Sequence, residues 1–400
     1  MHHLTRLVPG VRRWPVLIAL LALLVAAGGP ALAAHPLAQA GVLRIGYLGV
    51  AGSDLYKGAQ LAIDQINGAG GFQVTERGTV QLELVPLAAP PTADSLAADA
   101  NALIAQGVVA LLGPDESSTL TEDTVQALTT AGLPVLTAAT ADTLTGDDAT
   151  NTLLRIRAPE RLYSQALAAV LLDDLGLTSF ALVQTNLEST EALLAFESVL
   201  TGRGIAPGAR VQLADSAGLL GESRNLLDLN PEAVVMWGAP QDAANLLSLL
   251  RKGGWTGQFV YRQAEEAVRA GVLSKALAAG VIGASNWSYA HPGRASRIFL
   301  EDYLLAYGQV PGPLAAAGYD AIWALRAALI AGGTAPEALA AALVGAEPRN
   351  LVGGTLRPAD FGDGDMIRVV MVYRLSAGGA PTLLARFDDG QPVAIEETGG

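Results

Sequence analysis

The feature that most constrains the fold of this chain is a repeated alternation of short apolar runs with amphipathic helical patterns. Apolar runs predict strands, and an apolar period of about 3.6 residues predicts helices. In the first half of the sequence the expected strands are 43–48, 80–85, 108–112 and 133–136, and the expected helices are 55–66, 95–106 and 119–130. Strands that are apolar along their whole length are typical of a parallel sheet covered on both faces. The first half therefore predicts a doubly wound α/β unit.

The same alternation restarts after Arg157. The expected strands are 180–183, 233–237, 258–261 and 281–284, and the expected helices are 159–176, 188–200, 242–250 and 266–278. The stretch 292–344 reads as helical with breaks at 308–312 and 332–333, and a strand is expected at 367–375. Two α/β units followed by helices and a late strand predict two doubly wound lobes joined by more than one crossover.

The N-terminal segment has the three parts of a secretory signal. Arg6, Arg12 and Arg13 precede an apolar run over 15–27, and small residues follow at Ala31-Leu-Ala33. A buried first helix would explain the apolar run but not the basic start and the small-residue exit together. Twin-arginine export is a weaker alternative, because the residues around the arginine pair fit it poorly. We therefore predict a signal peptide over 1–33 and a periplasmic or secreted protein.

Composition narrows the function further. The chain has no cysteine, which excludes an acylated-cysteine anchor, thiol catalysis and thiolate metal sites. The net charge of −13 disfavours nucleic acid and anionic membrane surfaces as partners. Apart from His35 at the end of the predicted signal, the predicted mature chain has one histidine, His291. A histidine-dependent hydrolase triad or a multi-histidine metal site is therefore disfavoured. No stretch outside the signal reaches about 18 uninterrupted apolar residues, so a soluble mature chain is expected.

Four phrases of the sequence are distinctive: Ile45 to Gly71, with Tyr56-Lys-Gly-Ala-Gln-Leu-Ala and Asn67-Gly-Ala-Gly-Gly, then Val109 to Ser118, Gly132 to Thr140, and Ala316-Ala-Gly-Tyr-Asp-Ala-Ile322. They resemble landmarks of the branched-chain amino-acid (Leu/Ile/Val) binding proteins of ABC transporters. Their order and spacing are similar over nearly the whole mature chain. The resemblance implies a type I periplasmic binding protein, with two Rossmann-like lobes closing on a small ligand about a three-strand hinge. On this reading lobe I comprises 42–157 plus 288–345, and lobe II comprises 158–287 plus 346–400.

The resemblance also implies a non-enzymatic, monomeric protein that needs no cofactor or metal and delivers its ligand to an ABC permease. Two alternatives remain open. A protein of the same fold could report its ligand to a membrane receptor, and a secreted hydrolase could work with Asp/Glu pairs alone. The spacing of Gly46, Gly49 and Gly52 does not fit a dinucleotide loop. The run Asp360 to Asp365 fits a turn between strands better than a calcium loop.

The candidate ligand contacts lie where strands end. Ser117 and Ser118 stand between a strand and a helix, where hydroxyls and free amide groups can hold a carboxylate. The alternative is a helix cap, because Thr119-x-x-Glu122 fits a capping box. Ala138 and Thr140 match the loop from which the family offers a carbonyl and a hydroxyl to the ligand.

The second lobe departs from the family pattern. Gln263 stands where an acid commonly faces the ligand ammonium, and Asn186 follows the strand where a Tyr-Gly pair is usual. Glu265 or Glu266 could substitute for the acid, although both fit a solvated first helical turn. Trp237 is either the aromatic wall of the site or a core residue. The sequence therefore retains the residues expected to bind the carboxylate of an amino acid, whereas it leaves undecided which residue would bind the ammonium group.

Overall fold

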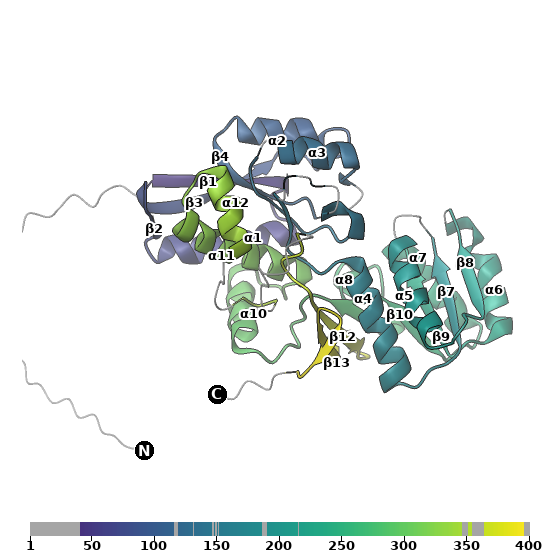
Figure 1. The fold of residues 1–400 in the computed structure, drawn as a ribbon. Coiled ribbons are helices and arrows are strands. Elements are labelled where there is room, and N and C mark those ends of the chain that lie inside the picture. Colours follow the sequence, from purple (N-terminus) through teal and green to yellow (C-terminus); the bar gives the residue numbers. More distant parts are fainter. Residues whose placement is uncertain are drawn as a thin grey trace, which may run out of the picture. The chain divides into compact units, whose positions relative to one another are not determined.

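The structure is a computed structural model, and it describes residues 41–115, 119–130, 132–145, 148, 150, 152–185, 190–214, 216–345, 351–353 and 364–395. The predicted signal peptide lies outside the described residues, as do three candidate contacts, Ser117, Ser118 and Asn186. The described residues form two β-sheets with helices on both faces (Figure 1). This confirms the predicted α/β class.

The first sheet has six strands in the order β2-β3-β1-β4-β5-β6. These strands are β1 (Gly41–Val50), β2 (Phe72–Val74), β3 (Gly78–Leu87), β4 (Val108–Leu112), β5 (Val135–Thr137) and β6 (Leu153–Arg155). All neighbouring pairs are parallel except β2 with β3. The predicted strands are found within a few residues of their expected bounds. The short strands β2 and β6 were not predicted.

Helices cover this sheet on both faces. Leu111 of β4 packs with α2 (Leu96–Ile104) and α3 (Glu122–Thr130). Its neighbours Ala110 and Leu112 point to the opposite face, where they pack with α1 (Asp54–Gly68) and α11 (Pro313–Gly332). The side chains on both faces of β4 are therefore buried, which explains why this strand is apolar along its whole length.

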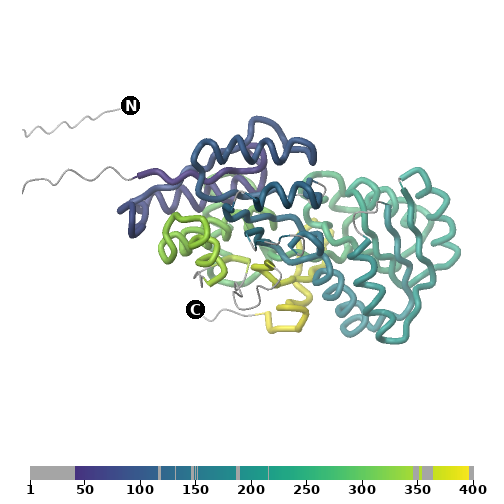
Figure 2. Tube along the Cα trace, turned by 45° about the horizontal axis from the view of Figure 1, so that its top comes forward, coloured from purple at the N-terminus to yellow at the C-terminus, as the bar shows by residue number. Residues whose placement is uncertain are grey.

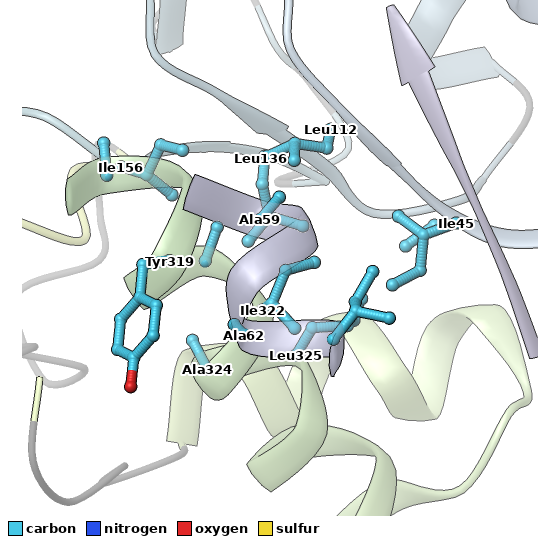
Figure 3. Close-up of a cluster of buried hydrophobic side chains, with 14 of the residues drawn as sticks. Ile45, Ala59, Ala62, Leu112, Leu136, Ile156, Tyr319, Ile322, Ala324 and Leu325 are labelled. Atoms are coloured by element: carbon cyan, nitrogen blue, oxygen red, sulfur yellow. The ribbon is translucent and has the colours of Figure 1, made fainter. Parts of the chain in front are cut away.

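Two small residues let α1 and α11 approach closely. A Cβ atom on Gly58 would lie 1.8 Å from the carbonyl oxygen of Ala315, and one on Gly318 would lie 2.2 Å from that of Leu55. Figure 3 shows the resulting core, with Ala59 and Ala62 of α1 beside Ile322 and Leu325 of α11. A residue larger than glycine at either position would force the helices apart.

The second sheet has eight strands in the order β14-β13-β12-β11-β10-β9-β7-β8. They are β7 (Phe180–Gln184), β8 (Ala209–Gln212), β9 (Ala233–Trp237), β10 (Gln258–Tyr261), β11 (Ile282–Ser285), β12 (Val369–Leu375), β13 (Pro381–Asp388) and β14 (Gln391–Val393). The strands β7 to β11 are parallel, and β12 to β14 are added antiparallel. The C-terminal strands thus complete a sheet begun some 200 residues earlier.

The helices on this sheet also form two layers. One face carries α4 (Glu160–Ala169) and α5 (Thr190–Gly202). The other carries α6 (Leu219–Leu229), α7 (Pro240–Lys252), α8 (Ala264–Arg269) and α9 (Lys275–Ala278). The helix expected over 266–278 is therefore two short helices, and α6 and β8 were not predicted.

The late helices return to the first sheet. Core residues of α10 (Arg294–Tyr307), α11 and α12 (Pro336–Gly345) belong to the same hydrophobic cluster as β1 and β3. Figures 1 and 2 both show α11 and α12 beside the purple N-terminal strands. The chain thus changes sheet three times, after β6, after β11 and between α12 and β12.

One described helix, α11, is long and apolar enough to cross a membrane by length and composition alone. Two thirds of its most apolar window (67%) is buried within the protein. Its apolar character is therefore explained by its place in the core between α1 and α12.

Candidate functional site

Each sheet has one position where the strand order reverses. In the first sheet β1 lies between β3 and β4, and in the second β7 lies between β8 and β9. Ligands of doubly wound sheets bind beyond the carboxyl ends of the strands at such a reversal. The relevant loops are those after β1 and β4 in the first sheet and those after β7 and β9 in the second.

A pocket of about 170 Å³ lies at the first reversal. Its lining residues come from the end of β1 and from the loops after β1, β3 and β4: Tyr47, Gly49, Val50, Ser53, Pro90, Pro91, Pro114, Asp115 and Thr119. Ser53 is the N-cap of α1 and accepts a hydrogen bond from the Tyr56 amide at 3.2 Å. Its hydroxyl also shares a hydrogen bond of 2.6 Å with that of Tyr47. Burial raises the pKa of Asp115, and the nearby positive charge of Arg157 only partly offsets this.

The loop after β5 carries Ala138 and Thr140. Ala138 is fully buried, and its amide donates to the Pro114 carbonyl at 3.1 Å, which ties this loop to the pocket. The Thr140 hydroxyl donates to Glu160 Oε1 at 2.5 Å. The same carboxylate oxygen is 3.0 Å from Arg262 Nη2. Thr140 is therefore connected through Glu160 to the loop after β10.

At the second reversal, Trp237 is 5% exposed and packs edge-on against Phe196, with ring centroids 5.5 Å apart. Most of its surface thus belongs to the core. Gly238 follows with φ of +146°, and a Cβ there would meet the Thr185 hydroxyl at 2.0 Å, so the turn requires glycine.

Gln263 lies beside this turn. The Tyr261 hydroxyl makes a bifurcated hydrogen bond to the Gly238 carbonyl at 3.1 Å and to Gln263 Oε1 at 3.2 Å. The structure therefore brings the loops bearing Trp237 and Gln263 together. Through Arg262 and Glu160 it also connects them to Thr140. The ligand roles of these residues remain predictions.

The expectation of a solvated Glu265 is wrong. This side chain is 1% exposed, and burial raises the pKa of its carboxyl group to about 8. A long-range contact holds this residue against β12, because the Tyr373 hydroxyl accepts from the Glu265 amide at 3.0 Å. Glu266 is partly exposed, and its Oε1 lies 3.8 Å from Arg157 Nη2.

Described contacts also show how α3 is capped and what Asp320 binds. The helix cap at α3 is formed by Thr121 and Thr124, whose amides and hydroxyls bond reciprocally, so the Thr119–Glu122 capping box is wrong. Asp320 accepts the amides of Val352 at 2.8 Å and Gly353 at 2.7 Å, and it therefore fastens α11 to that segment.

No group of three or more His, Cys, Asp or Glu side chains that could hold a metal occurs in the part of the chain that the structure describes. Residues 360–363 of the expected aspartate turn lie outside that part. Asp365 is buried, and both of its carboxylate oxygens pair with arginines, Oδ1 with Arg155 Nε at 3.0 Å and Oδ2 with Arg161 Nη2 at 3.2 Å.

Sequence reasoning missed Asp115, Arg157, Glu160 and Arg262. Asp115 stands directly after the Gly113-Pro114 break at the end of an apolar strand, and that position was a usable signal. The other three come together only through contacts between distant segments, for which no local pattern exists.

Two doubly wound sheets, three connections between them and polar groups at both strand-order reversals define the type I periplasmic binding fold. The profile of the family described as periplasmic binding protein matches residues 44–380. The chain belongs to this family of solute-binding proteins, which confirms the sequence-based assignment and an extracytoplasmic place of action. A comparison with curated protein sequences gave no match.

Solved structures with the same fold include the leucine-binding protein LivK of Thermotoga maritima, with 19% identity, a TM-score of 0.70 and coverage of 88% of this chain and 99% of that one. LivJ of Streptococcus pneumoniae in complex with isoleucine has 20% identity and a TM-score of 0.71, and the match covers 89% of this chain and 99% of that one. A solute-binding protein of Rhodopseudomonas palustris in complex with 3,4-dihydroxybenzoic acid has 18% identity and a TM-score of 0.72, and the match covers 87% of this chain and 98% of that one. At these identities the likeness concerns the fold.

Proposed function

We propose that this protein captures a small polar solute outside the cytoplasm and delivers it to the permease of an ABC importer. The observation that carries the proposal is the pocket at the β1/β4 reversal, where hydroxyls and a carboxylate converge between apolar walls. The solute class is an amino acid or a related carboxylate or amide. Structural relatives with isoleucine and with an aromatic carboxylate support this class. The segment 1–33 serves as the export signal and is removed.

Binding proceeds by hinge closure. Lobe I comprises 42–157 plus 288–345, lobe II comprises 158–287 plus 346–400, and the ligand bridges them. It stabilises the closed state by as much as its affinity for that state exceeds its affinity for the open one. Ser117, Ser118, Ala138 and Thr140 hold the anionic end of the solute. Asn186, Trp237 and Gln263 line the facing wall.

A thermal-shift titration tests the proposal. The protein lacking residues 1–33 is stripped of carried-over ligand and titrated with amino acids, their amides and short carboxylates. A ligand at 100 times its Kd adds about 2.7 kcal/mol of stability, which raises the melting temperature measurably. A saturable rise with one of these classes is the expected result, and no rise with any of them would contradict the proposed solute class.

A further inference from the structure

The β1/β4 pocket is electrostatically one-sided. Among its described lining residues, Asp115 is the one with a charged side chain. The remaining polar lining groups are the hydroxyls of Tyr47, Ser53 and Thr119, while Val50 and two prolines form apolar walls. A carboxylate in such a setting attracts a compact cation and repels an anion placed against it. The pocket therefore has the chemistry to receive an amino group.

The carboxylate of Asp115 is available for such a contact. Within the described residues, no other residue donates a hydrogen bond to it. The positive charge that acts on Asp115 is the guanidinium of Arg157, which has other partners. Its Nε donates to Asn286 Oδ1 at 3.3 Å, and its Nη2 lies 3.8 Å from Glu266 Oε1. Burial raises the pKa of Asp115 even though its own backbone amide donates to it, and an ammonium group from a ligand would counteract that shift.

The second lobe offers weaker alternatives. Gln263 has no charge, and its Oε1 accepts from the Tyr261 hydroxyl. Glu266 already faces Arg157, and Glu265 is buried against the Tyr373 strand. An ammonium group at Glu266 would compete with the guanidinium of Arg157 for the same carboxylate. An acid without an arginine partner, which the second lobe does not offer at this position, is thus present in the first lobe as Asp115.

We infer that Asp115 binds the amino group of the solute, so that the ammonium contact comes from the loop after β4 in lobe I. The inference rests on the proposed solute-binding function and narrows the solute to molecules that carry a primary ammonium beside their carboxylate. The ammonium lies between Asp115 and the paired hydroxyls of Tyr47 and Ser53.

The test combines a change in the protein with a change in the ligand. Calorimetric titration compares the wild type with Asp115→Asn, which keeps the shape of the side chain and removes its charge. The ligands are the L-amino acids and, for each one bound, its des-amino carboxylate, for example leucine and 4-methylpentanoate. Glu266→Gln is the matched control for an acid in the facing lobe. Melting temperatures without ligand verify that each variant is folded.

The expected result is that the wild type prefers the amino acid to its des-amino partner. Asp115→Asn should weaken amino-acid binding at least about tenfold, which corresponds to about 1.4 kcal/mol, and should leave des-amino binding unchanged. Loss of the amine preference in Glu266→Gln instead, or equal binding of both ligands by the wild type, overturns the inference while the solute-binding function stands. If the wild type binds neither ligand class, the proposed function fails and the inference fails with it.

Discussion

At the scale of single residues, several buried charged groups near the candidate site make contacts with residues far away in the sequence. Glu265 is an example, since its place in the first turn of α8 predicted a solvated carboxylate. The contact that buries its backbone comes from Tyr373, more than 100 residues later. The identity of a residue and its local pattern therefore indicate where a helix starts but not which of its side chains water reaches.

Glu265→Gln should change how stability depends on pH. Burial raises the carboxyl pKa from 4.5 to about 8, so between these values the native state holds a proton that the unfolded state has released. Stability from this group therefore falls as pH rises through that window, by up to about 1.4 kcal/mol per unit. The variant should melt like the wild type at pH 5 and at a higher temperature at pH 9. Glu301→Gln, at an exposed position of α10, is the control, and an unchanged melting difference between the two pH values in Glu265→Gln would refute the assignment.

Thr140→Ala should weaken solute binding about tenfold. The hydroxyl donates its one proton to Glu160 in this structure, so it would have to turn from Glu160 to the ligand carboxylate that its loop is proposed to hold. Loss of a hydrogen bond to a charged group costs about 1.5 kcal/mol or more. Thr140→Ser keeps the hydroxyl and should bind normally in the same titration. Undiminished binding by Thr140→Ala would mean that the hydroxyl serves Glu160 alone.

At the scale of helices and strands, burial on both faces decided what the sequence revealed. The central strands β4, β7 and β9 are apolar throughout and were predicted, because both faces are covered by helices. The edge strand β8 alternates between partly buried and exposed residues, and β14 is exposed along its length, so neither presents an apolar run. Of the candidate site, the strand-end loops were predictable. The bond of Thr140 to Glu160 and the pairing of Glu160 with Arg262 join segments that are distant in sequence, so no local pattern indicates them.

Gly58→Ala should destabilise the protein by about 1–3 kcal/mol, the usual cost of overpacking. The added methyl group would meet the carbonyl of Ala315, and backbone on both sides leaves no flexible side chain to move. Gly68→Ala is the matched control, because it lies at the end of the same helix with no atom within 4 Å of its added Cβ. Chemical denaturation should show a lower midpoint for the first variant and no loss for the second. Equal midpoints would show that the two helices can separate without cost.

At the scale of the whole molecule, the hinge closure proposed above would bring helices of the two sheets into contact. Arg269 of α8 reaches across to Asp54 at the start of α1, with Nη2 and Oδ2 2.8 Å apart. The two side chains belong to helices on different sheets and come from positions about 215 residues apart in sequence. If this pair forms as the proposed hinge closes, it favours the closed state and so raises ligand affinity without touching the ligand.

Arg269→Gln should therefore weaken solute binding up to about fivefold, since a partly exposed ion pair contributes at most about 1 kcal/mol. The effect should appear with every ligand that closes the hinge and should be matched by Asp54→Asn. Arg203→Gln is the control, because Arg203 pairs with Asp173 at 2.7 Å on a single lobe, where closure changes nothing. Raised salt should weaken binding by the wild type more than binding by Arg269→Gln, because the Arg269–Asp54 pair is already absent in the variant. If Arg269→Gln and Arg203→Gln bind the solute equally well, the Asp54 contact does not distinguish the closed state, and closure must be stabilised by the ligand alone.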